Sequence, residues 1–252
     1  MKALISAIKF LTIIPIDTRN RIEPGRMEGM LLCFPLVGLL LGGLCVAVLW
    51  LAGDVFPPAI AAALTVLALL VATGALHLDG LADTTDGLFG GATRERKLEI
   101  MRDPRVGTFG ISAIVFLTGL KVLALASIAA RGMGAALCIA LMTPLVGRWC
   151  ILLAAGMSSY ARDEEGTGRA AVEAARTWHF AAWAPVVALL GYVCLGLGGL
   201  LMLVLVLAVV VLVIIYIQSR INGMTGDTLG AVCEVSEMVF LLAFFVSAKL
   251  GL

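Results

Sequence analysis

Long apolar stretches alternate with shorter polar ones along the whole chain. Each apolar stretch runs for about 20 residues, the length that an α-helix needs to cross roughly 30 Å of hydrocarbon. The pattern predicts seven membrane-spanning helices, at residues 31–52, 57–76, 107–130, 135–156, 178–197, 199–217 and 235–252. The segment before them, which ends near Pro15, predicts a retained interfacial or half-inserted helix. We therefore expect an all-α fold, a polytopic integral membrane helical bundle.

The composition supports this class. Hydrophobic residues make up 61% of the chain and charged residues 14%, whereas a soluble domain averages roughly 45–50% apolar and about 25% charged. A formal net charge of +1 gives no reason to expect nucleic acid as a partner. Because no internal repeat or low-complexity tract divides the sequence, we expect residues 1–252 to form a single transmembrane catalytic domain surrounded by membrane lipid.

The connections between the predicted spans differ in length and charge. Those at 53–56, 131–134 and the turn near Gly198 are short, whereas those at 77–106, 157–177 and 218–234 are long and polar. Of the 18 Lys and Arg residues, 14 lie in the N-terminal segment or in these long connections. The positive-inside rule therefore predicts that the N-terminus and all the long connections face the cytoplasm.

The first acidic stretch, HLDGLADTTDG, runs from His77 to Gly87. Each residue of an α-helix turns by about 100°, so Asp83 and Asp86 lie about 40° and 20° from Asp79, on one face. Clustered carboxylates repel one another unless a cation is bound, and their hard oxygens favour Mg²⁺, Mn²⁺ or Ca²⁺ over zinc. His77 lies about 160° from Asp79, which suggests a substrate contact, a base or a cap. The alternative is a solvated helix end.

A second acidic stretch, NGMTGDTLGAVCE, runs from Asn222 to Glu234. Asp227 and Glu234 would lie about 20° apart on a helix, so two helices could turn carboxylates toward each other. The alternative is that Asn222 or Thr225 caps the last helix, with Asp227 in its first turn.

Two loops carry donors for anionic oxygens. Glycine lets backbone N–H groups approach a phosphate, the following helix adds its positive end, and arginine supplies a planar fork of donors. A diphosphate suits this combination, although both loops could also be ordinary interfacial turns. The candidate residues are Arg102, Arg105, Gly107 and Thr108 in the first loop, and Arg162, Gly166 and Gly168 in the second.

Two basic residues fall inside predicted spans. Arg148 lies near the cytoplasmic end of the fourth span, and an ionisable residue inside the membrane indicates a functional role. It could reach the phosphate-binding loops, snorkel to the membrane interface, or pair with a neighbouring helix. Lys121 lies deeper, and we expect it to form a structural ion pair.

Four segments in this order, HLDGLADTTDG, LEIMRDPRVGTFG, YARDEEGTG and TGDTLGAVCE, resemble the cobalamin synthase family, adenosylcobinamide-GDP ribazoletransferase. The resemblance covers nearly the whole chain. It implies a multi-pass, Mg²⁺-dependent enzyme of the bacterial inner membrane. Such an enzyme joins adenosylcobinamide-GDP to α-ribazole or its 5′-phosphate, releases GMP, and yields adenosylcobalamin or its 5′-phosphate.

The resemblance, together with the acidic face, assigns expected roles. Metal ligands are expected at Asp79, Asp83, Asp86, Asp227 and Glu234, and Asp86 or His77 is expected to accept the proton of the attacking hydroxyl. Substrate contacts are expected from the two loops and from Arg148, Asn222 and Thr225. A homo-oligomer, or a complex with other corrinoid-pathway enzymes, stays open.

Two alternative functions remain at this stage. An ion-coupled transporter also places carboxylates among helices, but near the middle of the membrane. A CDP-alcohol-phosphotransferase-like enzyme would carry the pattern DGxxAR, whereas here Asp83 follows Ala82 in place of the arginine.

Overall fold

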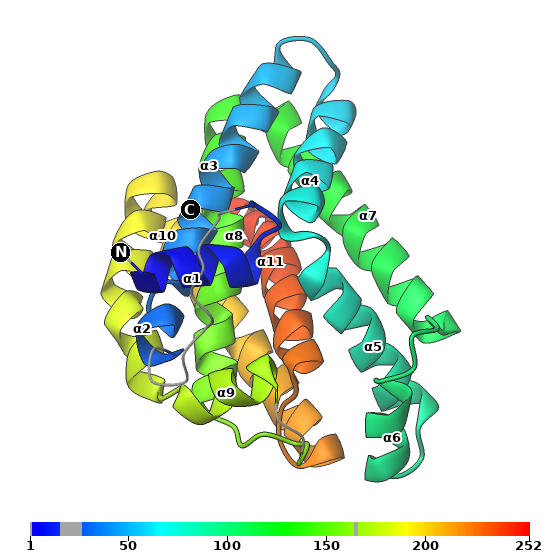
Figure 1. Ribbon diagram of the computed structural model, residues 1–252. Coiled ribbons are helices and arrows are strands. Elements are labelled where there is room, and N and C mark those ends of the chain that lie inside the picture. The colour runs from blue at the N-terminus through cyan, green and yellow to red at the C-terminus, as the bar shows by residue number, and fades with distance from the viewer. Residues whose placement is uncertain (1, 16–26, 164–165) are drawn as a thin grey trace.

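The computed structural model describes residues 2–15, 27–163 and 166–252, and these contain helices and no strand (Figure 1). The predicted all-α class is confirmed. Arg19, Arg21 and Arg26, which the charge count included, lie outside the described residues. The helices are α1 (Lys2–Leu11), α2 (Met27–Leu31), α3 (Phe34–Gly53), α4 (Pro58–Thr73), α5 (Leu76–Gly90), α6 (Arg94–Ile100), α7 (Thr108–Arg131), α8 (Met133–Gly156), α9 (Thr167–Ala174), α10 (Thr177–Ile221) and α11 (Gly226–Lys249).

Within the described ranges, five helical segments are long and apolar enough to cross a membrane. They are α2 with α3, α7, α8, α10 and α11, and the number rises to six if α4 and α5, which meet at an angle of 89°, form one broken span. The sequence predicted seven spans because it counted the region of α4, 57–76, as a span of its own and divided the α10 region into two.

The 45 residues of α10 would extend about 68 Å as one straight helix, more than twice the thickness of the hydrocarbon. The helix is instead broken at Gly196, whose φ of 62° suits glycine. A side chain at Gly199 would collide with the carbonyl oxygen of Gly191, so the two parts of α10 pack against each other. The predicted division of this region at 198–199 is therefore present, but it lies two residues earlier, at Gly196.

The last helix begins nine residues before the predicted position. Thr225 caps α11, because its hydroxyl accepts from the Thr228 backbone N–H at 3.2 Å and the Thr228 hydroxyl accepts from the Thr225 N–H at 2.8 Å. Asn222, at φ 56°, ends α10. The capping alternative is confirmed for Thr225, whereas Asn222 ends the preceding helix and does not cap the last one. The predicted loop at 218–234 is consequently mostly helix, and Glu234 lies inside the bundle.

α8 is the central helix, and its residues are almost all buried between α3, α10 and α11. α3 approaches it closely through Gly38 and Gly42. A Cβ at Gly38 would lie 2.6 Å from the Pro144 carbonyl oxygen, and one at Gly42 would collide with the Leu141 backbone. Small residues four apart commonly allow such close helix contacts in membranes.

The polar connections contain short helices at one end of the bundle. α6 and α9 lie at this end, opposite the α3–α4 turn (Figure 1). Arg94 of α6 holds the end together, because its Nε donates to the Ile221 carbonyl at 2.9 Å and its Nη2 to the Ala161 carbonyl at 2.6 Å. Nothing in the sequence pattern singled out this arginine.

Candidate active site

α5 and α11 lie side by side, and their first turns approach at two glycines (Figure 1). A Cβ at Gly80 would lie 2.7 Å from the carbonyl oxygen of Asp227, and one at Gly230 would lie 3.1 Å from that of His77. The absence of side chains lets the two backbones come this close. The two acidic stretches of the sequence therefore lie against each other.

A pocket of about 210 Å³ lies where these first turns meet. Asp79 and His77 of α5 and Asp227 of α11 line it, and α9 adds its first two residues. Apolar side chains from α1, α3, α5, α8 and α11 complete the wall, namely Phe10, Leu11, Phe34, Leu76, Ile151 and Leu229. We call this cavity the acidic pocket.

Negative charge dominates beside the acidic pocket. The half-buried carboxylate of Asp83 lies within electrostatic range of three other carboxylates, those of Asp79, Asp86 and Asp227. The opposing charge comes from Arg162, whose Nη2 donates to Asp227 Oδ2 at 2.8 Å. Because one guanidinium faces several carboxylates, a bound cation would relieve the repulsion.

Two helices begin at the same pocket. A Cβ at Gly168, in the first turn of α9, would lie 3.0 Å from Cα of Gly226, where α11 begins. The first N–H groups of a helix lack partners within it, and the positive end of its dipole attracts anions. The pocket thus combines carboxylates suited to a cation with two helix starts suited to an anion.

Asp86 shares the acidic face of α5 but has a different environment. Its two carboxylate oxygens accept backbone N–H groups, from Gly107 at 2.6 Å and from Gly110 at 2.8 Å. A side chain at either glycine would collide with this carboxylate. Asp86 therefore anchors the first turn of α7, and the Gly107 N–H binds Asp86 where the sequence suggested a phosphate. Neither the predicted catalytic role of Asp86 nor its predicted metal ligation is supported by this placement.

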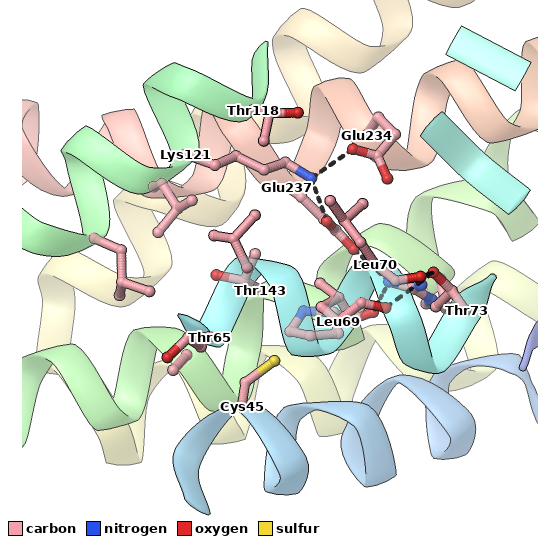
Figure 2. A pocket seen from close by; sticks show the side chains of 16 residues that line it. Cys45, Thr65, Leu69, Leu70, Thr73, Thr118, Lys121, Thr143, Glu234 and Glu237 are labelled. Carbon is pink, nitrogen blue, oxygen red and sulfur yellow. Dashed lines mark hydrogen bonds and ion pairs between the residues drawn. The ribbon is translucent and has the colours of Figure 1, made fainter. Parts of the chain in front are cut away.

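Glu234 and Arg148 lie deeper in the bundle, among buried charges. Lys121 donates to Glu234 at 2.7 Å and to Glu237 at 2.5 Å, and Figure 2 shows its ammonium between them. Arg148 pairs with Glu237, and its Nη2 lies 3.2 Å from Nδ1 of His77. A cavity of about 30 Å³ adjoins these groups.

The structural pairing expected for Lys121 is confirmed. Glu234 does not line the acidic pocket, and Arg148 takes the helix-pairing alternative.

The two predicted phosphate loops differ in position. Arg105 lies exposed beside the start of α7 and binds Asp103, with Nη2 2.7 Å from Oδ2. These hydrogen bonds lower the pKa of Asp103 to about 2. Arg102 is also exposed, and neither arginine lines the acidic pocket.

In the second loop, Arg162 binds Asp227 and Gly168 lines the pocket, while Gly166 precedes α9.

Residues 3–245 match the family described as Cobalamin-5-phosphate synthase. The chain belongs to this family. It is 33% identical over 247 residues to the adenosylcobinamide-GDP ribazoletransferase of Acetivibrio thermocellus, and these residues are 98% of each chain. The protein of that name from Clostridium novyi is 36% identical over the whole of both chains, and that from Klebsiella pneumoniae is 36% identical over 96% of this chain and 99% of its own. No solved structure matches the chain.

Membership of this family makes the protein an enzyme, a transferase of cobalamin biosynthesis. It confirms the resemblance inferred from the four sequence segments and decides against the transporter. The apolar helices agree with an enzyme embedded in a membrane.

The acidic pocket can be compared with the needs of Mg²⁺. Among the described residues, no group of three or more His, Cys, Asp or Glu side chains is arranged to hold a metal ion by itself. Mg²⁺ usually retains waters and binds through one or two carboxylates together with substrate phosphates. Asp79 and Asp227 supply such hard oxygen donors in the wall of one pocket, and the carboxylate of Asp83 lies within electrostatic range of both. The donor set therefore fits an ion that arrives with a phosphorylated substrate.

The contact at Gly80 gives a direct test of this arrangement. We expect Gly80→Ala to separate α5 from α11, because the new methyl group would meet the Asp227 backbone and not a flexible side chain. Transfer should fall at least about tenfold, since displacing reacting groups by roughly 1 Å commonly costs more than this. The matched control is Gly119→Ala in α7, where a Cβ has no neighbour within 4 Å. Initial rates on purified protein measure both, and equal rates would contradict the close contact.

Proposed function

We propose that the protein joins adenosylcobinamide-GDP to α-ribazole, or to its 5′-phosphate, and releases GMP. A ribose hydroxyl oxygen attacks the phosphorus on the cobinamide side of the diphosphate, the bond from that phosphorus to the oxygen of the departing GMP breaks, and the hydroxyl proton passes to solvent. The names of the relatives support the substrates. The observation that carries the proposal is the meeting of acidic residues from α5 and α11 beside two helix starts.

We assign the carboxylates at the pocket to cation binding and the helix starts to anion binding. Asp79, Asp83 and Asp227 would hold Mg²⁺ together with the diphosphate. A Mg²⁺ ion bound there would neutralise charge on the reacting diphosphate and on the departing GMP. The first N–H groups of α9 and α11 would bind phosphate oxygens. Arg162 orients Asp227 through their 2.8 Å contact and adds a positive charge.

We further propose that the pocket faces the cytoplasm of a bacterial cell, at the inner membrane. The support is the placement of basic residues. The short helices α6 and α9 lie at one end of the bundle, and α6 carries Arg94, Arg96 and Lys97 (Figure 1). Arg162 belongs to the same end, because the carbonyl of its neighbour Ala161 accepts from Arg94 at 2.6 Å. Basic residues concentrate on the cytoplasmic side of membrane proteins.

Two assays test these proposals, one for the reaction and one for the orientation. Purified protein is given adenosylcobinamide-GDP, α-ribazole and Mg²⁺, and the corrinoid product and GMP are measured. We expect equal amounts of both, and we expect a chelator to abolish the reaction until Mg²⁺ or Mn²⁺ is restored. Everted membrane vesicles should react with added substrates, whereas sealed right-side-out vesicles should not. Product formation that is indifferent to chelation would refute the metal, and activity in right-side-out vesicles alone would refute the orientation.

A further inference from the structure

A chain of buried polar contacts leads from the interior of the bundle to the acidic pocket. Lys121 of α7 binds Glu237 of α11, Glu237 binds Arg148 of α8, and Arg148 contacts His77 of α5. All four residues are buried, with relative exposures of 5% or less. His77 is the member of this chain that lines the acidic pocket. The network therefore ends at the proposed reaction site.

The contact between Arg148 and His77 determines which ring nitrogen carries the proton. A guanidinium has only donors, so the nitrogen 3.2 Å from Arg148 Nη2, which is His77 Nδ1, must accept. An imidazole that accepts at Nδ1 carries its proton on Nε2 and is neutral. Glu237 holds Arg148 in this position through its own ion pair.

Side-chain hydrogen-bond donors are scarce at the pocket. Of the described side chains that line it, only those of His77 and Thr167 carry an N–H or O–H group, because the others are apolar residues, glycines and aspartates. Carboxylates repel a diphosphate unless a cation intervenes, whereas an N–H group attracts it directly. Since Nδ1 faces Arg148, Nε2 is the ring nitrogen left for the pocket.

We propose that His77 donates a hydrogen bond from Nε2 to an anionic oxygen of the substrate diphosphate, and that Arg148 and Glu237 are positioning residues that fix this tautomer. The identity of the ligand rests on the proposed function, while the tautomer rests on the contacts alone. This role differs from the general base that the sequence suggested for His77, because a ring that is already protonated at Nε2 and blocked at Nδ1 accepts no further proton from a substrate.

The tautomer is measured by ¹⁵N NMR on full-length protein labelled at histidine. The chain has only two histidines, His77 and His179, so the spectrum of His77→Gln assigns the signals. We expect His77 to show one neutral form with a protonated Nε2 and a bare Nδ1. In Arg148→Met this preference should give way to a mixture of both neutral tautomers. A proton on Nδ1 in the wild-type protein would overturn the proposal whether or not the enzyme performs the proposed reaction.

The substrate contact is measured with GDP as a diphosphate probe. GDP with Mg²⁺ should shift the Nε2 signal of His77. The activity of side-chain variants gives a second readout, because glutamine keeps an amide donor near the position of Nε2 and methionine does not. His77→Met should lose roughly 10- to 100-fold in transfer, the range expected for a hydrogen bond to a charged group, and His77→Gln should recover part of it.

These outcomes separate the two proposals. If the wild-type protein performs the transfer but His77→Met matches it and GDP leaves the Nε2 signal unmoved, the inference about His77 fails alone. If GDP moves the signal but the wild-type protein forms no corrinoid product, the proposed function fails and the contact of His77 with a diphosphate stands.

Discussion

Asp83→Asn should lower transfer by roughly 100- to 1,000-fold while the helical bundle stays folded. Asparagine has nearly the same size and sits at a half-buried position, so packing changes little. It removes one negative charge from a group surrounded by three other carboxylates, which relieves repulsion in the folded protein. The same change weakens the site for a divalent ion, and losing one preorganised electrostatic partner in an active site commonly costs this much. Initial rates and thermal unfolding of the purified variant measure the two effects.

The control for this variant is Asp54→Asn. Asp54 is exposed and follows α3, in the turn at the opposite end of the bundle from α6 and α9. The chemical change is the same, so a general effect of charge on solubility or insertion would appear in both proteins. Wild-type turnover in Asp83→Asn would show that the carboxylate takes no part in the reaction.

Glu237→Gln should have the largest effect on stability. Glu237 pairs with both Lys121 and Arg148, and the substitution leaves these two buried cations with the single counter-charge of Glu234. Breaking a buried ion pair by removing one partner commonly costs about 3–5 kcal/mol. For a chain of this size, the unfolding temperature should fall on the order of 10 °C. Thermal unfolding in detergent measures the shift.

Two further variants show whether charge balance is the cause. Glu99→Gln breaks an exposed pair with Arg96 and should change the free energy of unfolding by less than about 1 kcal/mol. Adding Arg148→Met to Glu237→Gln removes one cation and leaves the balanced pair of Lys121 and Glu234, so the double variant should be more stable than Glu237→Gln alone. A double variant that is less stable than either single one would argue against this explanation.

The sequence predicted the direction of the carboxylates on each helix better than their surroundings. A 3.6-residue period turns Asp79, Asp83 and Asp86 to one side of α5. The start of α11 packs at Gly80, beside that side, and the start of α7 packs against Asp86. Periodicity does not tell which group lies opposite each residue. The partners of Asp86 are backbone N–H groups at Gly107 and Gly110, which follow it by more than 20 residues along the chain.

For the buried charges, too, the sequence predicted the position of a side chain better than its partners. The presence of Lys121 and Arg148 inside spans indicated that they need partners. Glu237 already lay in the predicted span 235–252, but Glu234 was placed in the connection before it. The pairing of Lys121 with both carboxylates became clear only when α11 was found to begin at Gly226. The hydropathy pattern placed the start of this helix too late, since a polar first turn resembles a loop when only apolarity is counted.

The most direct test of a shared cation site on α5 and α11 is the affinity for Mn²⁺ in the presence of GDP, measured by electron paramagnetic resonance. The measurement compares the wild-type protein, Asp79→Asn, Asp227→Asn and the double variant. If both carboxylates hold one ion, each single substitution should weaken binding at least about tenfold, and the double variant should lose much less than the product of the two losses. Losses that multiply independently, or unchanged affinity in either single variant, would contradict a site formed jointly by the two helices.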